Sequence, residues 1–85
     1  MKPTIIDVRE VNEYATGHVV GSLNIPLSQI PASSQIANLP RSATIVVYCR
    51  SGNRSALAKQ LLENAGFTNV VNGINEQAVR QKYRL

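Results

Sequence analysis

The segment Cys49–Ser55 contains the only cysteine of the chain, a glycine and two arginines, and it follows an apolar run that ends at Cys49. A helical pattern begins at Arg54 or Ser55, so the backbone N–H groups of the loop should converge at a helix N-terminus. With Gly52 free to adopt a positive φ, this predicts an anion cradle. Such settings lower a thiol pKa from about 8.5 to roughly 3.5–7.5, so we expect Cys49 to be a thiolate at neutral pH.

A lone cysteine at the end of a strand can also be a small buried hydrophobic residue. Here the order of strand, Cys49, four residues, Arg54 and helix supplies a nucleophile, a backbone cradle and a counter-charge together, which favours catalysis. Cysteine phosphatases resemble this site, but their arginine lies six positions after the cysteine, where this chain has Ser55. The shorter loop favours a single sulfur carried on Cys49 over a phosphoryl group. A phosphatase or arsenate reductase remains an alternative.

The elements that must position this loop follow from hydropathy and turn residues. Strands are predicted at residues 4–8, 22–25, 44–49 and 67–71; helical segments are predicted at 10–16, at 28–39 in broken form, and from 54 or 55 to 64, with a turn at Asn72–Gly73 and a tail compatible with a helix. Alternating strands and helices predict an α/β fold, a small mainly parallel sheet flanked by helices. Ligands bind such sheets at the carboxyl ends of the strands, where Cys49 lies.

Composition limits the class of protein. With 85 residues, 44% hydrophobic and 16% charged, the chain predicts one folded domain over residues 1–85 rather than a disordered segment. One cysteine excludes an intramolecular disulfide and a structural Cys/His zinc site. No apolar run has the length of a membrane span or signal peptide, so we expect a soluble cytoplasmic protein, or a periplasmic one if an export signal was removed.

The net charge of +4 points weakly to anionic partners. Arg80, Lys82 and Arg84 form a basic tail that we interpret as solvated, with docking to an acidic partner or steering of anions as the alternative. Nucleic-acid binding is disfavoured because the basic residues are few and no aromatic residues are interleaved with them.

Two long motifs in the right order resemble the single-domain rhodaneses, the thiosulfate sulfurtransferases, and the small phage-shock type in particular. The first reads Ile6-Asp7-Val8-Arg9-Glu10, then Glu13-Tyr14 and Gly17-His18-Val19-Val20-Gly21-Ser22-Leu23-Asn24-Ile25-Pro26, similar to the family's D-V-R-E, E-Y and G-H-I-x-G-A-x-N-I-P. The second is Val47-Tyr48-Cys49-Arg50-Ser51-Gly52-Asn53-Arg54-Ser55. The resemblance implies a rhodanese-like three-layer fold. The family's closing Gly-Gly-x-x-x-Trp is absent, and Asn72-Gly73-Ile74-Asn75-Glu76-Gln77 stands in its place.

The resemblance also implies a function. Cys49 would take the outer sulfur of thiosulfate as a persulfide, release sulfite, and pass the sulfur to cyanide or to a thiol such as glutathione, thioredoxin or a sulfur-relay protein. The loop residues would bind the substrate: Arg50, Ser51, Gly52, Asn53 and Arg54. We expect no cofactor, no metal, no membrane partner and a monomer. The alternative is a persulfide carrier or regulatory module with little turnover on free thiosulfate.

Outside the loop, four polar residues of the first motif are interpreted as structural. Asp7 is expected to hold neighbouring loops, and Arg9 to pair with Glu13 close to the surface. His18, the only histidine, lies in a Gly-His turn, where a hydrogen-bonded structural imidazole is favoured over a general base.

Overall fold

The computed structural model describes residues 2–85, so the first residue of the predicted domain lies outside the described part of the chain. The strands are β1 (Thr4–Asp7), β2 (Leu23–Asn24), β3 (Ile45–Cys49) and β4 (Val70–Asn75). The α-helices are α1 (Val11–Ala15), α2 (Ser34–Ala37), α3 (Asn53–Asn64) and α4 (Glu76–Tyr83), and a 3-10 helix, η1, spans Leu27–Ala32. Within residues 2–85, no helix is long and apolar enough to cross a membrane.

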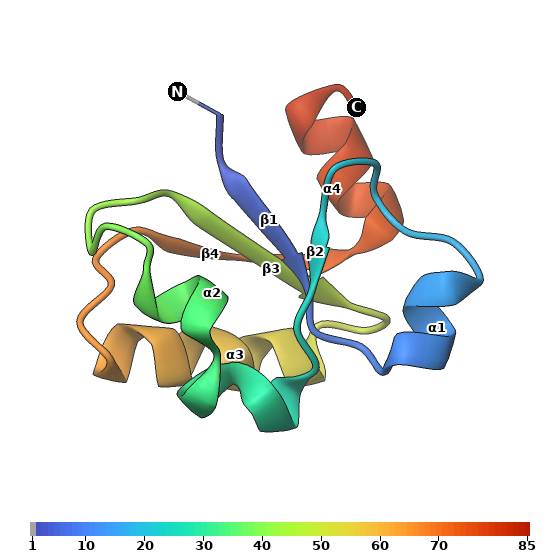
Figure 1. Ribbon diagram of the computed structural model, residues 1–85. Helices are drawn as coiled ribbons and strands as arrows, with labels where there is room; N and C mark the ends of the chain where they lie inside the picture. The colour runs from blue at the N-terminus through green and yellow to red at the C-terminus, as the bar shows by residue number, and fades with distance from the viewer. Residues whose placement is uncertain (1) are drawn as a thin grey trace.

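The four strands form one sheet in the order β2-β1-β3-β4, and every pairing is parallel. Helices α2 and α3, with η1, cover one face, and α4 lies on the opposite side of the sheet (Figure 1). The predicted α/β fold, a small parallel sheet flanked by helices, is therefore confirmed. The strand β3 lies in the interior of the sheet, as its continuous apolar run predicts.

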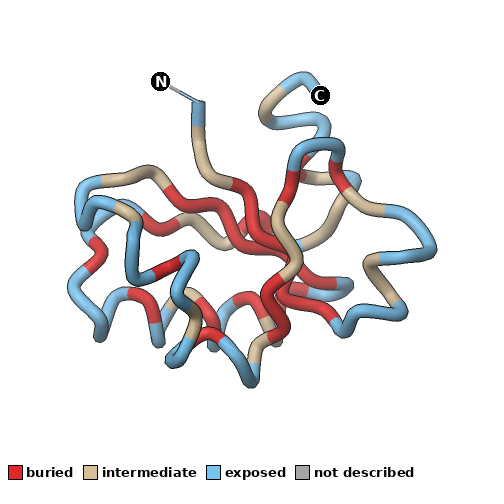
Figure 2. The backbone as a smooth tube through the Cα atoms, viewed as in Figure 1, coloured by how far each residue is buried: buried red, intermediate tan, exposed pale blue. Residues whose placement is uncertain are grey.

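Alternate residues of β3 point to two separate hydrophobic clusters. Ile45, Val47 and Cys49 pack on the side of α3, whereas Val46 and Tyr48 pack on the side of α4, where Val79 joins them. All five residues of β3 are buried, and the buried part of the backbone is concentrated in the strands (Figure 2). Burial on both faces fixes the register, because a slip of one residue would exchange the two sets of side chains.

The helix α3 begins earlier than the sequence predicted. Its N-terminal cap is Gly52, which has the predicted positive φ of 93°, and the first helical residue is Asn53. The apolar face of α3 that the sequence predicted to be buried is buried only in part. Ala58 and Leu62 are fully buried, but Leu57 and Leu61 are exposed. The buried stripe of α3 is narrower than predicted because η1 and the sheet together cover only one side of this helix.

The carboxyl-terminal part of the chain differs most from the prediction. The turn expected at Asn72–Gly73 does not form, because β4 continues to Asn75. Asn72 is paired with Val47 and Ile74 with Tyr48, so Gly73 is the extra residue of a bulge. A Cβ at Gly73 would lie 2.5 Å from Val79, so no larger residue fits there. This close approach is what allows α4 to pack directly against the sheet.

Candidate functional site

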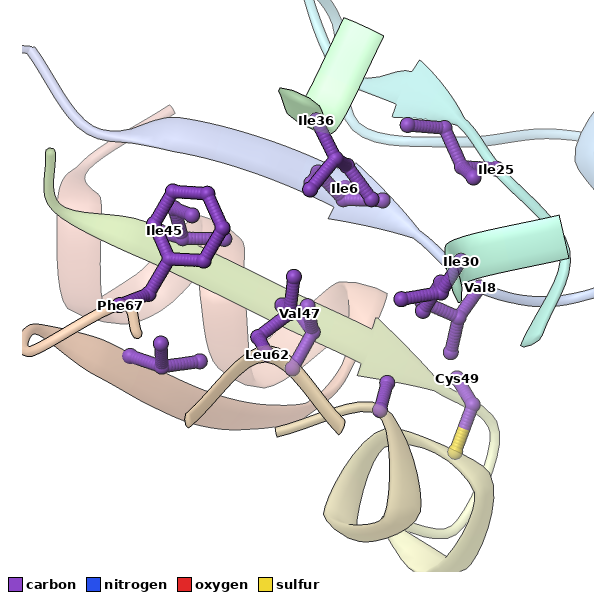
Figure 3. Close-up of a cluster of buried hydrophobic side chains, with 12 residues drawn as sticks. Ile6, Val8, Ile25, Ile30, Ile36, Ile45, Val47, Cys49, Leu62 and Phe67 are labelled. Atoms are coloured by element: carbon purple, nitrogen blue, oxygen red, sulfur yellow. The ribbon is translucent and has the colours of Figure 1, made fainter. Parts of the chain in front are cut away.

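Cys49 is the last residue of β3, at the carboxyl edge of the sheet, and only 2% of its surface is exposed. Figure 3 shows its side chain at the end of the row formed by Ile45 and Val47. Its Sγ accepts a hydrogen bond of 3.1 Å from the backbone N–H of Gly52 and lies 3.4 Å from the Ser55 hydroxyl. The sulfur at the end of β3 thus lies beside the start of α3, and the positive φ of Gly52 orients its N–H toward the sulfur.

The surroundings of Cys49 act on its pKa in opposite directions. Burial raises the pKa, but hydrogen bonds from the Ser55 side chain and from the backbone N–H groups of Ser55, Gly52 and Ser51 outweigh it and lower the pKa to about 7. The expectation of a lowered pKa is met, because a value of about 7 lies within the range expected for a thiol at a helix N-terminus. A thiol whose pKa lies near ambient pH combines a large thiolate fraction with high nucleophilicity.

Cys49 opens into a cleft of about 380 Å³. Arg9 and Arg50, from the segments that follow β1 and β3, line part of it, and the rest of the lining comes from the end of β4 and from α4: Asn75, Glu76, Gln77 and Arg80. Arg80 is held by an ion pair with Glu76 and by a 3.2 Å hydrogen bond to the carbonyl of His18. Three arginines, Arg9, Arg50 and Arg80, therefore line the cleft beside Cys49, which suits an anionic ligand.

Arg54 lies outside the lining of this cleft. Its guanidinium donates two hydrogen bonds to the carboxylate of Glu13, at 2.7 and 3.0 Å, and this pair ties α3 to α1. The side-chain hydrogen bond from Arg54 lowers the pKa of Glu13 to about 2, with help from the backbone N–H of Glu10. The backbone N–H groups of Ser51 and Gly52 do donate to the sulfur. The charge of Arg54 interacts with that of Cys49, although Arg54 does not line the cleft.

The predicted ion pair between Arg9 and Glu13 is wrong. Arg9 instead forms a two-pronged ion pair with Asp7, which is completely buried, and it also donates a 2.8 Å hydrogen bond to the carbonyl of Gly17. The hydrogen bond to Asp7 raises the pKa of Arg9. Two residues apart along an extended chain, Asp7 and Arg9 lie on the same side, and Glu13 is left to Arg54. Asp7 and Arg9 therefore hold the loops that follow β1.

His18 has the structural role that the sequence favoured. Its ring stacks on Tyr14 with a centroid distance of 3.6 Å, and its Nδ1 lies 2.8 Å from the Tyr14 carbonyl. The buried Tyr48 hydroxyl accepts a hydrogen bond from the backbone N–H of Val19, and this bond attaches the loop that contains His18 to β3. His18 does not line the cleft around Cys49.

The sequence interpretation missed two groups of site residues. Ser55 was assigned only to the start of a helix, and Asn72 to a turn, yet the Ser55 hydroxyl contacts both Cys49 and Asn72. Arg80 was assigned to a solvated tail, with steering of anions as the alternative, and Glu76 and Gln77 only to the segment that replaces the family's closing motif, yet all three line the cleft. A signal was available for Ser55, which directly follows Arg54 in the first turn of α3. The bulge in β4 that positions α4 beside the site leaves no signal in the hydropathy pattern.

Several known proteins are similar to this chain in sequence and in fold. The family model described as rhodanese-like domain matches residues 1–75. The thiosulfate sulfurtransferase PspE of Escherichia coli is 39% identical over 67 residues, which are 79% of this chain and 64% of PspE. The putative sulfur carrier protein YrkF of Bacillus subtilis is 35% identical over 68 residues, 80% of this chain and 36% of YrkF. The chain is therefore shorter than these relatives.

A solved structure described as a rhodanese with anions, from Escherichia coli, has a TM-score of 0.82 at 34% identity and covers 91% of both chains. A rhodanese-like domain from Anabaena also reaches a TM-score of 0.82, at 28% identity, over 96% of this chain and 93% of that domain. The family model matches residues 1–75 and the fold agrees with it, so the chain belongs to the family of rhodanese-like domains.

Proposed function

We propose that the protein is a thiosulfate sulfurtransferase that carries sulfur as a persulfide on Cys49. The observation that supports this most is a sulfur with a pKa of about 7, held by the Gly52 N–H and the Ser55 hydroxyl, at the base of an arginine-lined cleft. The relative PspE is named a thiosulfate sulfurtransferase. No cofactor takes part in this chemistry.

Two displacements at sulfur make up the proposed reaction. The Cys49 thiolate attacks the outer sulfur of thiosulfate, the S–S bond of the donor breaks, and sulfite leaves with its electron pair. The anionic charge now lies on the outer sulfur of the Cys49 persulfide. A nucleophilic acceptor, cyanide or a thiolate, attacks that sulfur and releases Cys49 as thiolate. The N–H donors of the loop serve both steps, because they stabilise an anionic sulfur before and after transfer.

Binding of a dianion is assigned to the charged groups at the mouth of the cleft. Arg50 is exposed, lies next to Cys49 and forms none of the ion pairs found within residues 2–85. It is the first candidate to pair with the sulfonate oxygens of thiosulfate. The backbone of Ser51, Gly52 and Asn53 would cradle the transferred sulfur, and Arg54, held by Glu13, would act through its charge alone.

Steady-state formation of thiocyanate from thiosulfate and cyanide tests this function. We expect turnover that saturates with thiosulfate and is abolished in Cys49→Ser. Loss of turnover in Arg50→Gln through a higher KM, with kcat little changed, would match its assignment to donor binding. Equal activity of Cys49→Ser and the unchanged protein would contradict the proposal.

A second function, a persulfide carrier loaded by a partner protein, is favoured by one feature of the site. Arg54 is neutralised by Glu13, so the loop offers less free positive charge to a small dianion than its sequence suggests. The relative YrkF is named a putative sulfur carrier. A carrier would accept sulfur from a protein persulfide rapidly but show negligible turnover with free thiosulfate, whereas a low KM for thiosulfate would exclude it.

A further inference from the structure

Asn72, on β4, links the active-site loop to the strand beside it through three hydrogen bonds. Its Nδ2 donates to the carbonyl of Gly52 at 3.2 Å. Its Oδ1 accepts from the backbone N–H of Ile74 at 3.0 Å and from the hydroxyl of Ser55 at 2.6 Å. The same Ser55 hydroxyl lies 3.4 Å from the sulfur of Cys49.

These partners fix which end of the Asn72 amide faces Ser55. A carbonyl can only accept, so the group facing Gly52 must be the NH₂, and the backbone N–H of Ile74 requires an oxygen at the other end. Ser55 therefore faces an acceptor, and it can bond to Asn72 only by donating its single hydroxyl proton. Ser55 is completely buried, so bulk water does not supply a substitute donor.

The protonation state of Cys49 decides whether this arrangement is satisfied. While Cys49 is a thiol, its S–H can donate to Ser55 and the Ser55 hydroxyl can donate to Asn72. Once Cys49 is a thiolate, both the sulfur and the Asn72 oxygen are acceptors, and only one of them can receive the hydroxyl proton. We propose that Asn72 is a positioning residue that competes with the Cys49 thiolate for the hydroxyl proton of Ser55, and so keeps the thiol from becoming too acidic.

The proposed competition has a consequence for the reaction. The nucleophilicity of a thiolate falls as its thiol becomes more acidic, and an attacking thiol works best when its pKa lies near ambient pH. By favouring the protonated thiol of Cys49, Asn72 would lower the fraction of thiolate but keep the remaining thiolate more nucleophilic. The inference rests on the proposed role of Cys49 as nucleophile only for this consequence, because the proton competition itself needs no sulfur transfer.

Other charged groups face Cys49 from the elements packed around it, and none of them is substituted in the test variants. They come from the segment after β1, the loop, α3 and α4: Arg9, Arg50, Arg54, Glu76 and Arg80. A change in proton affinity caused by substitution at Asn72 can therefore be compared across variants that share the same surrounding charges.

The test is the pH dependence of Cys49 alkylation by iodoacetamide, followed by intact mass, in a double-mutant cycle. Asn72→Leu keeps the approximate volume and removes the competing acceptor, so we expect the alkylation midpoint to move about 0.5–1 pH unit lower. Ser55→Ala alone should move the midpoint higher, because the thiolate loses a donor. In the Ser55→Ala background, Asn72→Leu should have no effect.

A purely structural role for Asn72, holding Gly52 in place, predicts the opposite sign, because loss of the Gly52 N–H would raise the midpoint. A higher or unchanged midpoint in Asn72→Leu, or the same shift in both backgrounds, would overturn the proposal. If Asn72→Leu fails to fold in a thermal melt, Asn72→Asp provides a stronger acceptor. The midpoint should then rise more with Ser55 present than with Ala at that position, and equal rises would overturn the proposal.

Alkylation separates this inference from the proposed function. A protein that fails to form thiocyanate but shows the expected cycle would refute the sulfurtransferase proposal and retain the proton competition. Thiocyanate formation with no coupling between Asn72 and Ser55 would do the reverse.

Discussion

Gly73 lies in the bulge of β4, where the sheet and α4 are in close contact, and substitution there tests how α4 is held beside the site. An ideal Cβ at this position would lie 2.5 Å from Val79 Cγ2, 2.9 Å from Val46 Cγ1 and 3.2 Å from the carbonyl of Val47. Favourable contacts between carbon atoms lie at about 3.5–4.0 Å, so Val79 would have to retreat by about 1 Å. Because Val79 belongs to α4, this displacement would move the helix that bears Arg80.

The expected effect of Gly73→Ala is a loss of about 2 kcal/mol in the free energy of unfolding. Overpacking of a well-packed core costs typically about 1–3 kcal/mol, and contacts on two sides place this site at the upper end. The reduced flexibility of the unfolded chain returns about 0.4–1 kcal/mol. The change is measured by urea denaturation monitored by circular dichroism. It would be a large fraction of the total free energy of unfolding of a domain of this size.

The matched control is the double variant Gly73→Ala/Val79→Ala. Val79→Ala alone should cost about 2 kcal/mol, because a fully buried side chain loses two methyl groups. Val79→Ala also removes the side chain that the new Cβ would meet at 2.5 Å. The double variant should therefore lose about 1 kcal/mol less stability than the sum of the two single losses. Strict additivity, or a Gly73→Ala protein as stable as the unchanged one, would refute the packing argument.

Three further predictions concern charge. Asp7→Asn leaves the largely buried guanidinium of Arg9 without its counter-charge, so the free energy of unfolding, measured by urea denaturation, should fall by about 3 kcal/mol. A loss below about 1 kcal/mol would show that the ion pair is not essential for stability. Arg80→Gln should slow sulfur transfer to a carboxylate-bearing thiol such as glutathione about two- to five-fold while leaving neutral dithiothreitol unaffected, and Lys82→Gln, outside the cleft, should change neither rate. Because a thiol reacts as its thiolate, kcat/KM should rise with pH through about 7 as Cys49 ionises, and a flat profile there would contradict the assigned pKa.

Hydropathy and turn residues were enough to predict the sheet and the main helix of this protein. The apolar run of β3 was the strongest strand prediction, and the helix predicted from Arg54 or Ser55 corresponds to α3, which begins one or two residues earlier. The cradle around Cys49 followed from the same two features, because a parallel strand followed by a helix must bring backbone N–H groups to the strand end. These are local properties, and the structure agrees with them.

The parts that the sequence did not reveal depend on pairings between distant residues. Glu13 could have paired with either arginine, and the choice of Arg54 over Arg9 was decided by the buried Asp7, which already occupies Arg9. In the same way, Asn72 resembled a turn residue because its partners, such as Ser55, lie far from it along the chain. Side-chain partners across elements are set by the tertiary packing, not by the local pattern.

The extension of β4 and the packing of α4 had a similar cause. The dipeptide Asn72–Gly73 is typical of a turn, but here the glycine provides the space for Val79 rather than a reversal of the chain. Ile74 then adopts a φ of 76°, a conformation that a β-branched residue takes only where surrounding contacts impose it. The strand therefore continues to Asn75, whose side chain caps α4.

The central claim, that Cys49 accepts and returns one sulfur atom, is tested most directly by intact mass spectrometry. After incubation with thiosulfate and removal of excess donor, the protein should gain the mass of one sulfur atom, located on the peptide that contains Cys49. Cyanide should remove that mass and yield an equal amount of thiocyanate, and Cys49→Ser should gain nothing. An unchanged mass after thiosulfate and after a protein persulfide donor, or a gain that survives in Cys49→Ser, would contradict the account.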